Sequence, residues 1–223
     1  MISTLFGSQA QDRFSINAYA DFAKYASAND SLKRSDVPPK VVFMGNSITE
    51  AWVNMRPSFF EDHGFIGRGI GGQVSHQMLL RFQADVIDLN PQVVVILAGT
   101  NDIAQNSGPV TIDQIMNNIE AMASLAKGNK IKVVLCSVLP AIGFPWFPEI
   151  SPASLIITLN ERIQQYAETN EFVYADYYST MVDSKGGLKV PEYTSADDLV
   201  HPNANGYAVM EEVLLVTLKP LLD

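Results

Sequence analysis

The chain of 223 residues is poor in cysteine and histidine, and it contains no long apolar run. Cys136 is the only cysteine, so a disulfide within the chain is excluded, and its apolar neighbours predict a buried thiol. The three histidines and this cysteine show no metal-ligand spacing, so we predict no metal site. No apolar stretch approaches the ~20 residues that a membrane span requires, so no span is predicted.

Positive charge is also scarce. Fifteen lysines and arginines stand against 24 aspartates and glutamates, which gives a formal net charge of -9, and the basic residues form no stripe. Because such a chain repels phosphate backbones, nucleic acid is a poor candidate partner. The chain has neither a Gly-x-x-x-x-Gly-Lys-Ser/Thr loop nor a dinucleotide-binding fingerprint, so we expect no cofactor. A small neutral substrate fits this composition best, and the composition leaves the oligomeric state open.

The first eleven residues, MISTLFGSQAQ, are apolar and then rich in small side chains. This pattern is typical of the end of a secretory signal, although no basic segment precedes it. If residues 1–11 are a signal remnant, the protein is expected to be periplasmic or secreted; if they begin a helix, it is expected to be cytoplasmic. We predict one domain over residues 1–223, because a single core can serve a chain of up to ~250 residues.

Short apolar runs rich in valine and isoleucine alternate with segments of helical period. The runs predict five strands buried on both faces, at residues 40–45, 64–70, 92–99, 131–139 and 172–176. Helical periods occupy 110–128, 151–170 and 203–222, with Ser151 as the expected N-cap of the second and Pro220 as the expected end of the third. Strands that alternate with helices predict an α/β fold, a parallel sheet with helices on both faces.

In open parallel sheets, ligands bind beyond the carboxyl ends of the strands. Polar and glycine residues follow the first three predicted strands, and a loop rich in proline and aromatic residues, 137–152, follows the fourth. This loop is too apolar for a simple solvated connection, so we predict that Phe144, Trp146 and Phe147 contact the substrate. The alternative is that these aromatic rings only cover the core beside the fourth strand.

Ser47 ends the stretch VVFMGNS, where a strand is predicted to turn into a helix. A serine at such a corner is either a helix cap or a nucleophile, and a nucleophile needs a base and an orienting acid. His63 lies beside a turn glycine, and His76 begins a predicted helix without an acid close to it in the sequence. His201 has Asp198 three residues before it, so His201 is the predicted base.

Two acidic residues precede this histidine. We prefer Asp198 to Asp197 as the orienting acid, because a separation of three residues lets one turn bring the carboxylate to the ring of His201. Pro202 biases the backbone of His201 away from the α region, which fixes how the ring leaves the chain. The alternative for Asp198 is an acidic residue near a helix start, where the helix dipole favours negative charge.

An acyl-transfer site also needs donors aimed at the developing oxyanion. Gly71 or Gly72 can present a backbone N–H, because glycine permits close approach and positive φ. Asn101, after the third strand, can supply a side-chain amide. Its alternative interpretation is a turn residue within the sequence GTND.

Four ordered stretches, FMGNSITEAW, RGIGGQ, AGTND and DLVHPNANGY, resemble the four blocks of the SGNH hydrolases, also called GDSL-type esterases. They extend from residue 43 to 207, which is most of the chain. The resemblance implies a three-layer, flavodoxin-like sandwich with a five-stranded parallel sheet of order 2-1-3-4-5. It also implies a serine esterase that needs no cofactor.

The resemblance assigns roles to five residues. Ser47 is implied as the nucleophile, with Asp198 and His201 completing the triad, and Gly72 and Asn101 are implied as oxyanion donors beside the N–H of Ser47. The first block departs from the family pattern, because an asparagine precedes the serine where the family usually has aspartate.

The substrate class follows from the same comparison. GNSITEAW and RGIGGQ resemble the acetylhydrolase-like branch of the family, so a short acyl ester, an acetylated sugar above all, is the expected substrate. The alternatives are a lysophospholipase or thioesterase of the same family and a catalytically weak relative that binds carbohydrate.

Overall fold

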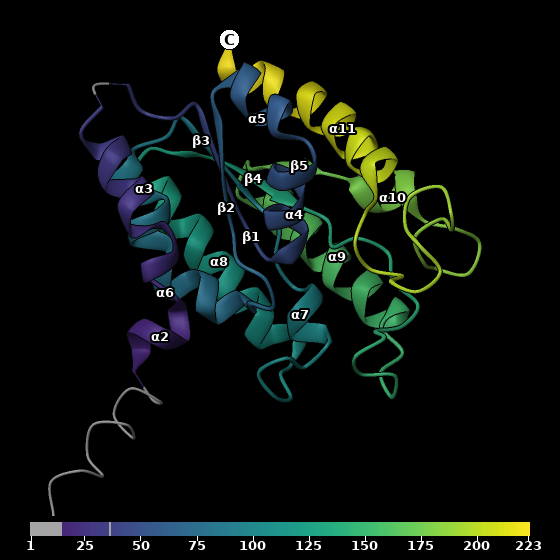
Figure 1. Ribbon diagram of the computed structural model, residues 1–223. Helices are drawn as coiled ribbons and strands as arrows, with labels where there is room; N and C mark the ends of the chain where they lie inside the picture. Colours follow the sequence, from purple (N-terminus) through teal and green to yellow (C-terminus); the bar gives the residue numbers. More distant parts are fainter. Residues whose placement is uncertain (1–14, 36) are drawn as a thin grey trace, which may run out of the picture.

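The computed structural model describes residues 15–35 and 37–223, so the predicted signal remnant lies outside the described residues. Five parallel strands form one sheet in the order β2-β1-β3-β4-β5 (Figure 1). The strands are β1 (Val41–Gly45), β2 (Phe65–Gly69), β3 (Val93–Ile96), β4 (Lys132–Cys136) and β5 (Val173–Ala175). This order confirms the predicted α/β, flavodoxin-like sheet.

The observed strands are shorter than the apolar runs that predicted them. β1 pairs with β2 from Val41 to Gly45 and with β3 from Val41 to Met44. The residues after β3, 97–99, stay almost completely buried, yet they leave the sheet ladder and lead into a short helix. In these runs apolar character therefore marks burial rather than the extent of the strand, and the residues after β3 and β4 belong to loops at the carboxyl edge of the sheet.

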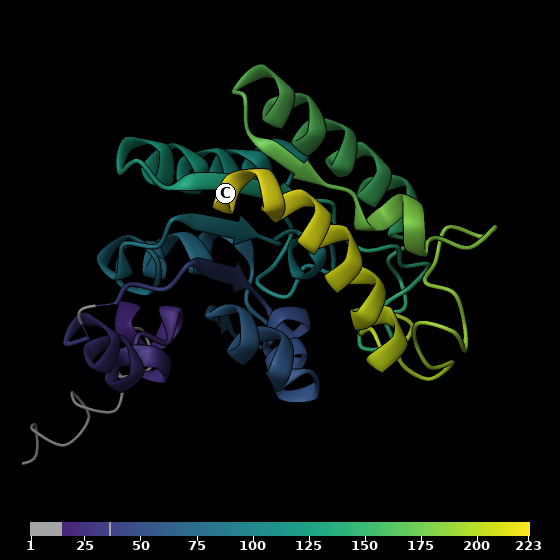
Figure 2. The same cartoon turned by 90° about the horizontal axis from the view of Figure 1, so that it is seen from above.

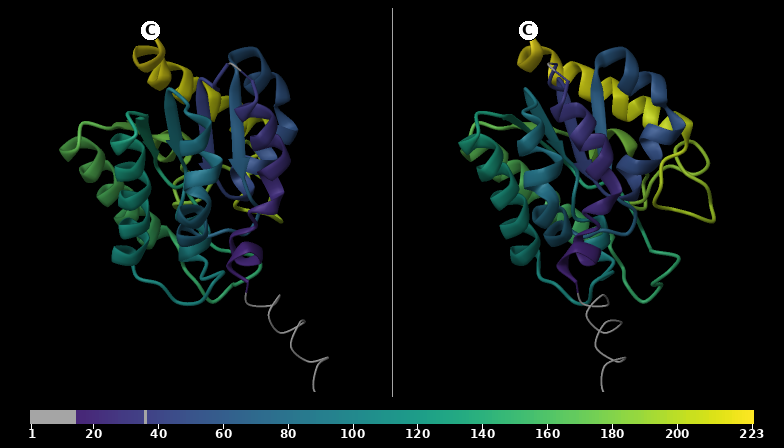
Figure 3. Two further views of the ribbon diagram at one scale, coloured as in Figure 1. Left: turned by 90° about the vertical axis from the view of Figure 1, so that its left-hand side faces the viewer. Right: turned by 60° about the vertical axis from the view of Figure 1, so that its left-hand side comes forward.

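Helices cover both faces of the sheet. They are α2 (Ile16–Ala20), α3 (Ala23–Lys33), α4 (Ser47–Met55), α5 (Pro57–His63), α6 (Ser75–Asp85), η1 (Ile87–Leu89), α7 (Thr100–Ile103), α8 (Ile112–Gly128), α9 (Ala153–Thr169), α10 (Tyr177–Met181) and α11 (Ala204–Leu222). Seen from above, α8 and α9 lie on one side of the sheet and α11 and α4 on the other (Figure 2). Figure 3 shows the same layers from the side, with α8 and α9 separated from α5 and α11 by the strands.

Each face of the sheet has its own apolar core. One core joins α6, α8 and α9 to the sheet through fully buried residues such as Phe82, Met122 and Leu159. The other core joins α4, α5, α10 and α11 and is rich in aromatic rings, with Trp52 packed edge-on against Phe43 at 5.6 Å. Together the two cores sandwich the sheet as the alternation of strands and helices predicts.

Cys136 ends β4 and is 1% exposed, which confirms the predicted buried thiol. Burial raises the pKa of Cys136 to about 12, against a smaller lowering by its hydrogen bond to the Tyr177 hydroxyl. None of the helices in the described part of the chain is long and apolar enough to cross a membrane.

Two predicted helix ends are wrong. The N-cap of α9 is Pro152, whose carbonyl accepts from the N–H of Ile156 at 2.9 Å, so Ser151 lies one residue outside the helix. α11 continues through Pro220 to Leu222. Pro220 is exposed in the final turn, where the hydrogen bond that a proline removes is replaced by water at little cost.

Helix α11 is fastened to α4. The hydroxyl of Tyr207 donates to the carbonyl of Ile48 at 2.8 Å. Glu211, buried in the same interface, accepts from the indole of Trp52 at 3.1 Å and pairs with the guanidinium of Arg56 at 2.7 Å. These bonds fix the helix that follows the C-terminal histidine against the helix that begins with Ser47.

Candidate active site

Ser47 is the first residue of α4, immediately beyond the carboxyl end of β1. Asn46 is the N-cap of this helix, and its side-chain oxygen accepts from the N–H of Ile48 at 3.0 Å. The asparagine that departs from the family pattern thus supplies the acceptor that the corner requires. Gly69 of β2 makes the close packing possible, because a Cβ added there would lie 2.3 Å from the N of Glu50.

The loop before α11 brings His201 to this corner. Nε2 of His201 lies 2.9 Å from Oγ of Ser47. On the other side of the ring, Nδ1 lies 2.9 Å and 3.1 Å from the two carboxylate oxygens of Asp198. With the proton on Nδ1 donated to Asp198, Nε2 is free to accept from the Ser47 hydroxyl. The structure thus brings the three predicted residues into one hydrogen-bonded chain.

A tight turn holds Asp198 in place. Its Oδ1 also accepts from the backbone N–H of His201 at 2.8 Å and of Val200 at 3.1 Å. Partial burial raises the pKa of the Asp198 carboxyl, but the hydrogen bonds from the backbone and imidazole of His201 outweigh it and hold the pKa below its ordinary value. The carboxylate therefore stays ionised beside the imidazole at neutral pH.

The competing residues lie elsewhere. Asp197 is exposed, and within the described residues it makes no hydrogen bond to His201. His63 ends α5 beside the turn glycine Gly64, where it stacks on Phe65 and Nδ1 lies 2.9 Å from the carbonyl of Phe59. His76 begins α6 as predicted and stacks on Tyr19.

The glycine segment after β2 separates the two candidate N–H donors. The N–H of Gly71 donates to the carboxylate of Glu50 at 2.7 Å. Gly72 has φ of +76°, and its N–H has no acceptor within the part of the chain that the structure describes. Since one N–H is engaged and the other is free, Gly72 is the better oxyanion donor of the pair.

Asn101 lies in the first turn of α7 rather than directly at the end of β3, and it is 3% exposed. Its Nδ2 donates to the carbonyl of Gln73 at 3.0 Å. An amide nitrogen carries two hydrogens, so this bond orients the group and leaves one hydrogen for a ligand. Gln73 follows Gly72, so the two candidate donors are linked through one segment.

A second hydrogen-bonded bridge crosses the site. Nδ2 of Asn106 donates to the carbonyl of Gly72 at 3.3 Å, and Oδ1 of Asn106 accepts from the indole of Trp146 at 3.0 Å. The Trp146 ring lies 6.4 Å from the ring of His201 and is 46% exposed. Sequence reasoning missed Asn106, because nothing local in its sequence indicates that two loops meet there.

Trp146 stands between two open hollows. One, of about 520 Å³, is lined by Gly72, Asn106 and Trp146. The other, of about 410 Å³, is lined by Trp146, Asp198 and His201. The indole therefore separates the side of Gly72 from the side of His201.

The other two predicted aromatic contacts are placed differently. Phe144 is 1% exposed and lies in the core, with its ring 5.3 Å from that of Trp146. Phe147 is half-buried and lines the hollow on the Gly72 side. Phe144 thus supports Trp146 from below, whereas Trp146 and Phe147 face the hollows.

This arrangement is suited to acyl transfer. A hydroxyl, an imidazole and a carboxylate are hydrogen-bonded in series, and free N–H groups of Gly72 and Asn101 lie on the neighbouring loops. Among the described residues, no group of three or more side chains could hold a metal ion. Ser47, Gly72 and Asn101 follow the carboxyl ends of β1, β2 and β3, where ligand sites of parallel α/β folds are expected, and the loop before α11 brings His201 to them.

Comparisons with known proteins identify the family. Residues 43–209 match the model of the GDSL-like lipase/acylhydrolase family. A GDSL-like lipase from Bacteroides thetaiotaomicron has a similar structure, with TM-score 0.86 and 48% identity, and the match covers 91% of this chain and 98% of that one. An acetyl xylan esterase is 25% identical with TM-score 0.65, over 79% of this chain and 98% of its own.

A curated relative gives a partial match. The uncharacterized lipoprotein YqeF of Bacillus subtilis is 30% identical over 97 residues, which are 42% of this chain and 40% of the relative's length. The family model and the structural match span far more of the chain. The chain therefore belongs to the GDSL-like lipase/acylhydrolase family and is a carboxylic ester hydrolase.

Proposed function

We propose that this protein hydrolyses short-chain acyl esters, acetyl esters above all, through a Ser47-His201-Asp198 triad and an acyl-enzyme. The observation that carries the proposal is the continuous hydrogen-bonded chain from the Ser47 hydroxyl through both nitrogens of His201 to Asp198. This series of groups is the arrangement that activates a serine for attack on a carbonyl carbon.

The proposed reaction has two halves. Nε2 of His201 takes the proton of Ser47 as Oγ attacks the carbonyl carbon, and it then gives that proton to the departing alcohol. The carbonyl oxygen gains negative charge, which the N–H groups of Ser47 and Gly72 and the amide of Asn101 stabilise. Water, deprotonated by His201, then releases the acid and restores the serine.

The two sides of Trp146 are proposed to receive different parts of the ester. The alcohol must leave beside its proton donor, so it occupies the hollow lined by His201 and Asp198. The acyl group then lies on the Gly72 side, whose polar, solvent-facing residues include Gln105 and Asn106. Methylene groups beyond the first one or two would either meet the indole of Trp146 or gain little burial against these polar residues, which supports a short acyl group.

A sugar is the proposed alcohol. The exposed face of Trp146 beside His201 suits the apolar face of a sugar ring. The similarity to an acetyl xylan esterase supports the same substrate class. Both features also support placing the chain in the acetylhydrolase-like branch of the family.

A series of 4-nitrophenyl esters from C2 to C8 tests the proposal. We expect kcat/KM to be highest for acetate and to fall with chain length. A rise toward C8, at ~0.8 kcal/mol for each buried methylene, would instead indicate a lysophospholipase or thioesterase. Absence of Ser47-dependent turnover throughout the series would contradict the proposal and favour the catalytically weak relative.

A further inference from the structure

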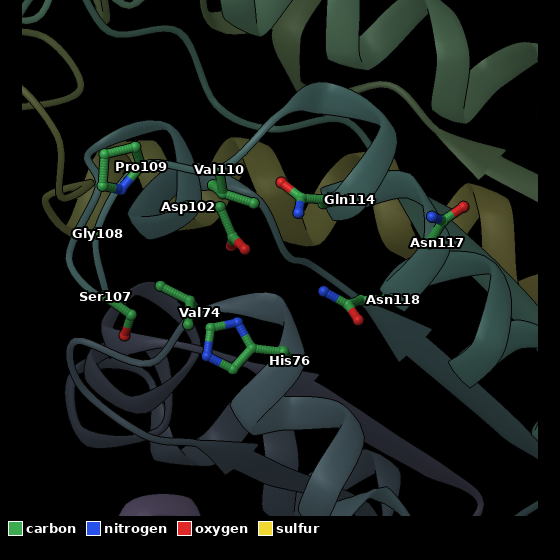
Figure 4. A pocket seen from close by; sticks show the side chains of 10 residues that line it. All are labelled: Val74, His76, Asp102, Ser107, Gly108, Pro109, Val110, Gln114, Asn117 and Asn118. Atoms are coloured by element: carbon green, nitrogen blue, oxygen red, sulfur yellow. The ribbon is translucent and has the colours of Figure 1, made fainter.

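A third hollow, of about 380 Å³, lies between the start of α6, the loop after α7 and the first turns of α8 (Figure 4). Its volume is within the range of small-molecule sites, ~300–1,000 Å³. In Figure 4 the side chains of Asp102, Gln114, Asn118 and His76 point into one space. These residues are outside the proposed triad and oxyanion hole.

A buried network gives this hollow a fixed floor. Asp102 is 1% exposed, and its Oδ1 accepts from the N–H of Ser75 at 3.0 Å and from the Ser75 hydroxyl at 2.5 Å. Nδ2 of Asn118 in turn donates to the same hydroxyl at 2.9 Å. The remaining hydrogen and the oxygen of the Asn118 amide are thereby held in one orientation.

Further polar groups on the walls have spare capacity. Oε1 of Gln114 accepts from the N–H of Thr111 at 2.9 Å, which leaves its NH₂ group for a ligand. Within the described residues, the amide of Asn117 and Nδ1 of His76 make no hydrogen bond to protein. The hollow therefore offers both donors and acceptors, of which the amides of Gln114 and Asn118 are oriented by bonds to protein.

The charges around the hollow limit the ligand. Lysine and arginine are absent from its described walls, so a phosphate or carboxylate would lack a partner. The single carboxylate, that of Asp102, is buried and already bonded to Ser75, which is too little to bind a cation. Val74, Pro109 and Val110 add an apolar surface. Mixed amide groups beside an apolar surface match a neutral ring that carries several hydroxyls.

We propose that this hollow binds a neutral sugar unit. Its walls continue directly from the segments with the oxyanion donors, because Val74 is two residues after Gly72 and Asp102 follows Asn101. A saccharide bound here lies beside the catalytic segments without occupying them. The binding does not require esterase activity, but the link to the substrate rests on the proposed function, in which the ester alcohol is a sugar.

Titration of the intact protein with xylobiose, followed by ¹H–¹⁵N NMR, tests the proposal. We expect saturable shifts in the side-chain NH₂ signals of Gln114 and Asn117 and in the backbone signals of residues 107–118. Asn117→Leu and His76→Phe should each weaken binding about tenfold, the effect of one lost hydrogen bond. Gln165→Leu, which removes an exposed amide on α9, is the matched control and should bind like the parent protein.

The proposal would be overturned if these signals do not shift even at the highest soluble concentration of xylobiose. It would also be overturned if both pocket variants bind xylobiose with unchanged affinity. The NMR spectrum of each variant reports its fold directly. Turnover of 4-nitrophenyl acetate, measured separately on the parent protein, distinguishes the two proposals. Turnover without xylobiose binding would contradict the sugar site and support the proposed esterase. Binding without turnover would support the sugar site and contradict the proposed esterase.

Discussion

Oγ of Ser47 lies 2.9 Å from Nε2 of His201, although the two residues are 154 positions apart in the chain. The contact depends on two separate pieces of structure. The β1 corner presents the hydroxyl, and the turn from Asp198 to His201 presents the ring with its other nitrogen bonded to a carboxylate. Each piece can be disturbed without the other, so the roles of these residues can be tested one at a time.

Replacement of the serine is expected to remove activity and leave the fold intact. Ser47→Ala deletes one half-buried hydroxyl at the start of α4, while the helix cap is provided by Asn46. We expect kcat for 4-nitrophenyl acetate to fall about 10⁴-fold with an unchanged melting temperature. A variant that kept more than a tenth of parental turnover would show that another residue is the nucleophile.

Catalysis by the triad is expected to need the neutral imidazole of His201, because Nε2 must accept the proton of Ser47. kcat/KM should therefore fall as the solution is acidified. Asp198 does not cause a fall that begins at neutral pH, because its lowered pKa keeps the carboxylate ionised there. The stability that the ionised Asp198 contributes is complete above the unfolded pKa of about 3.9 and is lost as pH falls through the lower folded value. A value of kcat/KM that does not fall on acidification would argue against His201 as the base.

The tautomer of His201 is testable separately. Asp198→Asn can no longer hold the proton on Nδ1, so kcat should fall by about 10²- to 10⁴-fold. Asp197→Asn is the matched control, because this neighbour is exposed. An equal loss of kcat in the two variants would mean that kcat depends on the negative charge of the loop and not on the hydrogen bond between Asp198 and His201.

The oxyanion role of Asn101 predicts a loss confined to the transition state. Asn101→Ala should lower kcat by about 10²-fold, equivalent to ~3 kcal/mol, with little change in KM. Because Asn101 also bonds to the Gln73 carbonyl, a melting curve is needed beside the kinetics. A raised KM with unchanged kcat would show that Asn101 only binds substrate.

The bridge from Gly72 through Asn106 to Trp146 is expected to limit acyl length. Trp146→Ala should raise kcat/KM for C6 and C8 esters relative to acetate, since the wall between the two hollows is removed. Asn106→Ala should shift the profile in the same direction, because it frees the indole. Asn129→Ala, at the exposed end of α8, is the control, and an acetate preference unchanged in all three variants would disprove this role.

The fastening of α11 to α4 should affect catalysis from a distance. Tyr207→Phe removes the bond to the Ile48 carbonyl, so the free energy of unfolding should fall by about 1 kcal/mol and kcat should fall with it. Tyr178→Phe, a half-buried tyrosine on α10, is the control. If Tyr207→Phe lowers stability and kcat is unaffected, α11 stabilises the fold without positioning His201.

Much of the fold could be predicted because the apolar runs and the helical periods are local features. The positions of Ser47, Asp198 and His201 could also be predicted, since each lies in a short stretch with its own turn chemistry. Contacts between loops could not. Asn106 and Trp146 form their hydrogen bond only after β3 and β4 are paired. The sequence around either residue does not predict this contact.

The buried face of a helix was also harder to predict than the helix itself. The helical period over residues 203–222 is present as α11, but its apolar residue Val216 is 78% exposed. The buried positions are instead Tyr207, Met210, Leu214 and Leu218. A valine-rich helix has more than one apolar stripe. The orientation in which the helix packs on the sheet decides which stripe is buried.

The fastening of α11 to α4 also has a consequence for the order of events during synthesis. A nascent chain that ends near residue 190 already contains the serine and both oxyanion segments, but it contains neither His201 nor the helix that holds it in place. If the proposed triad is correct, hydrolysis begins only after His201 has left the ribosome and reached Ser47. If α11 also positions His201, ester turnover by a freshly translated chain would then report the packing of α11 on α4.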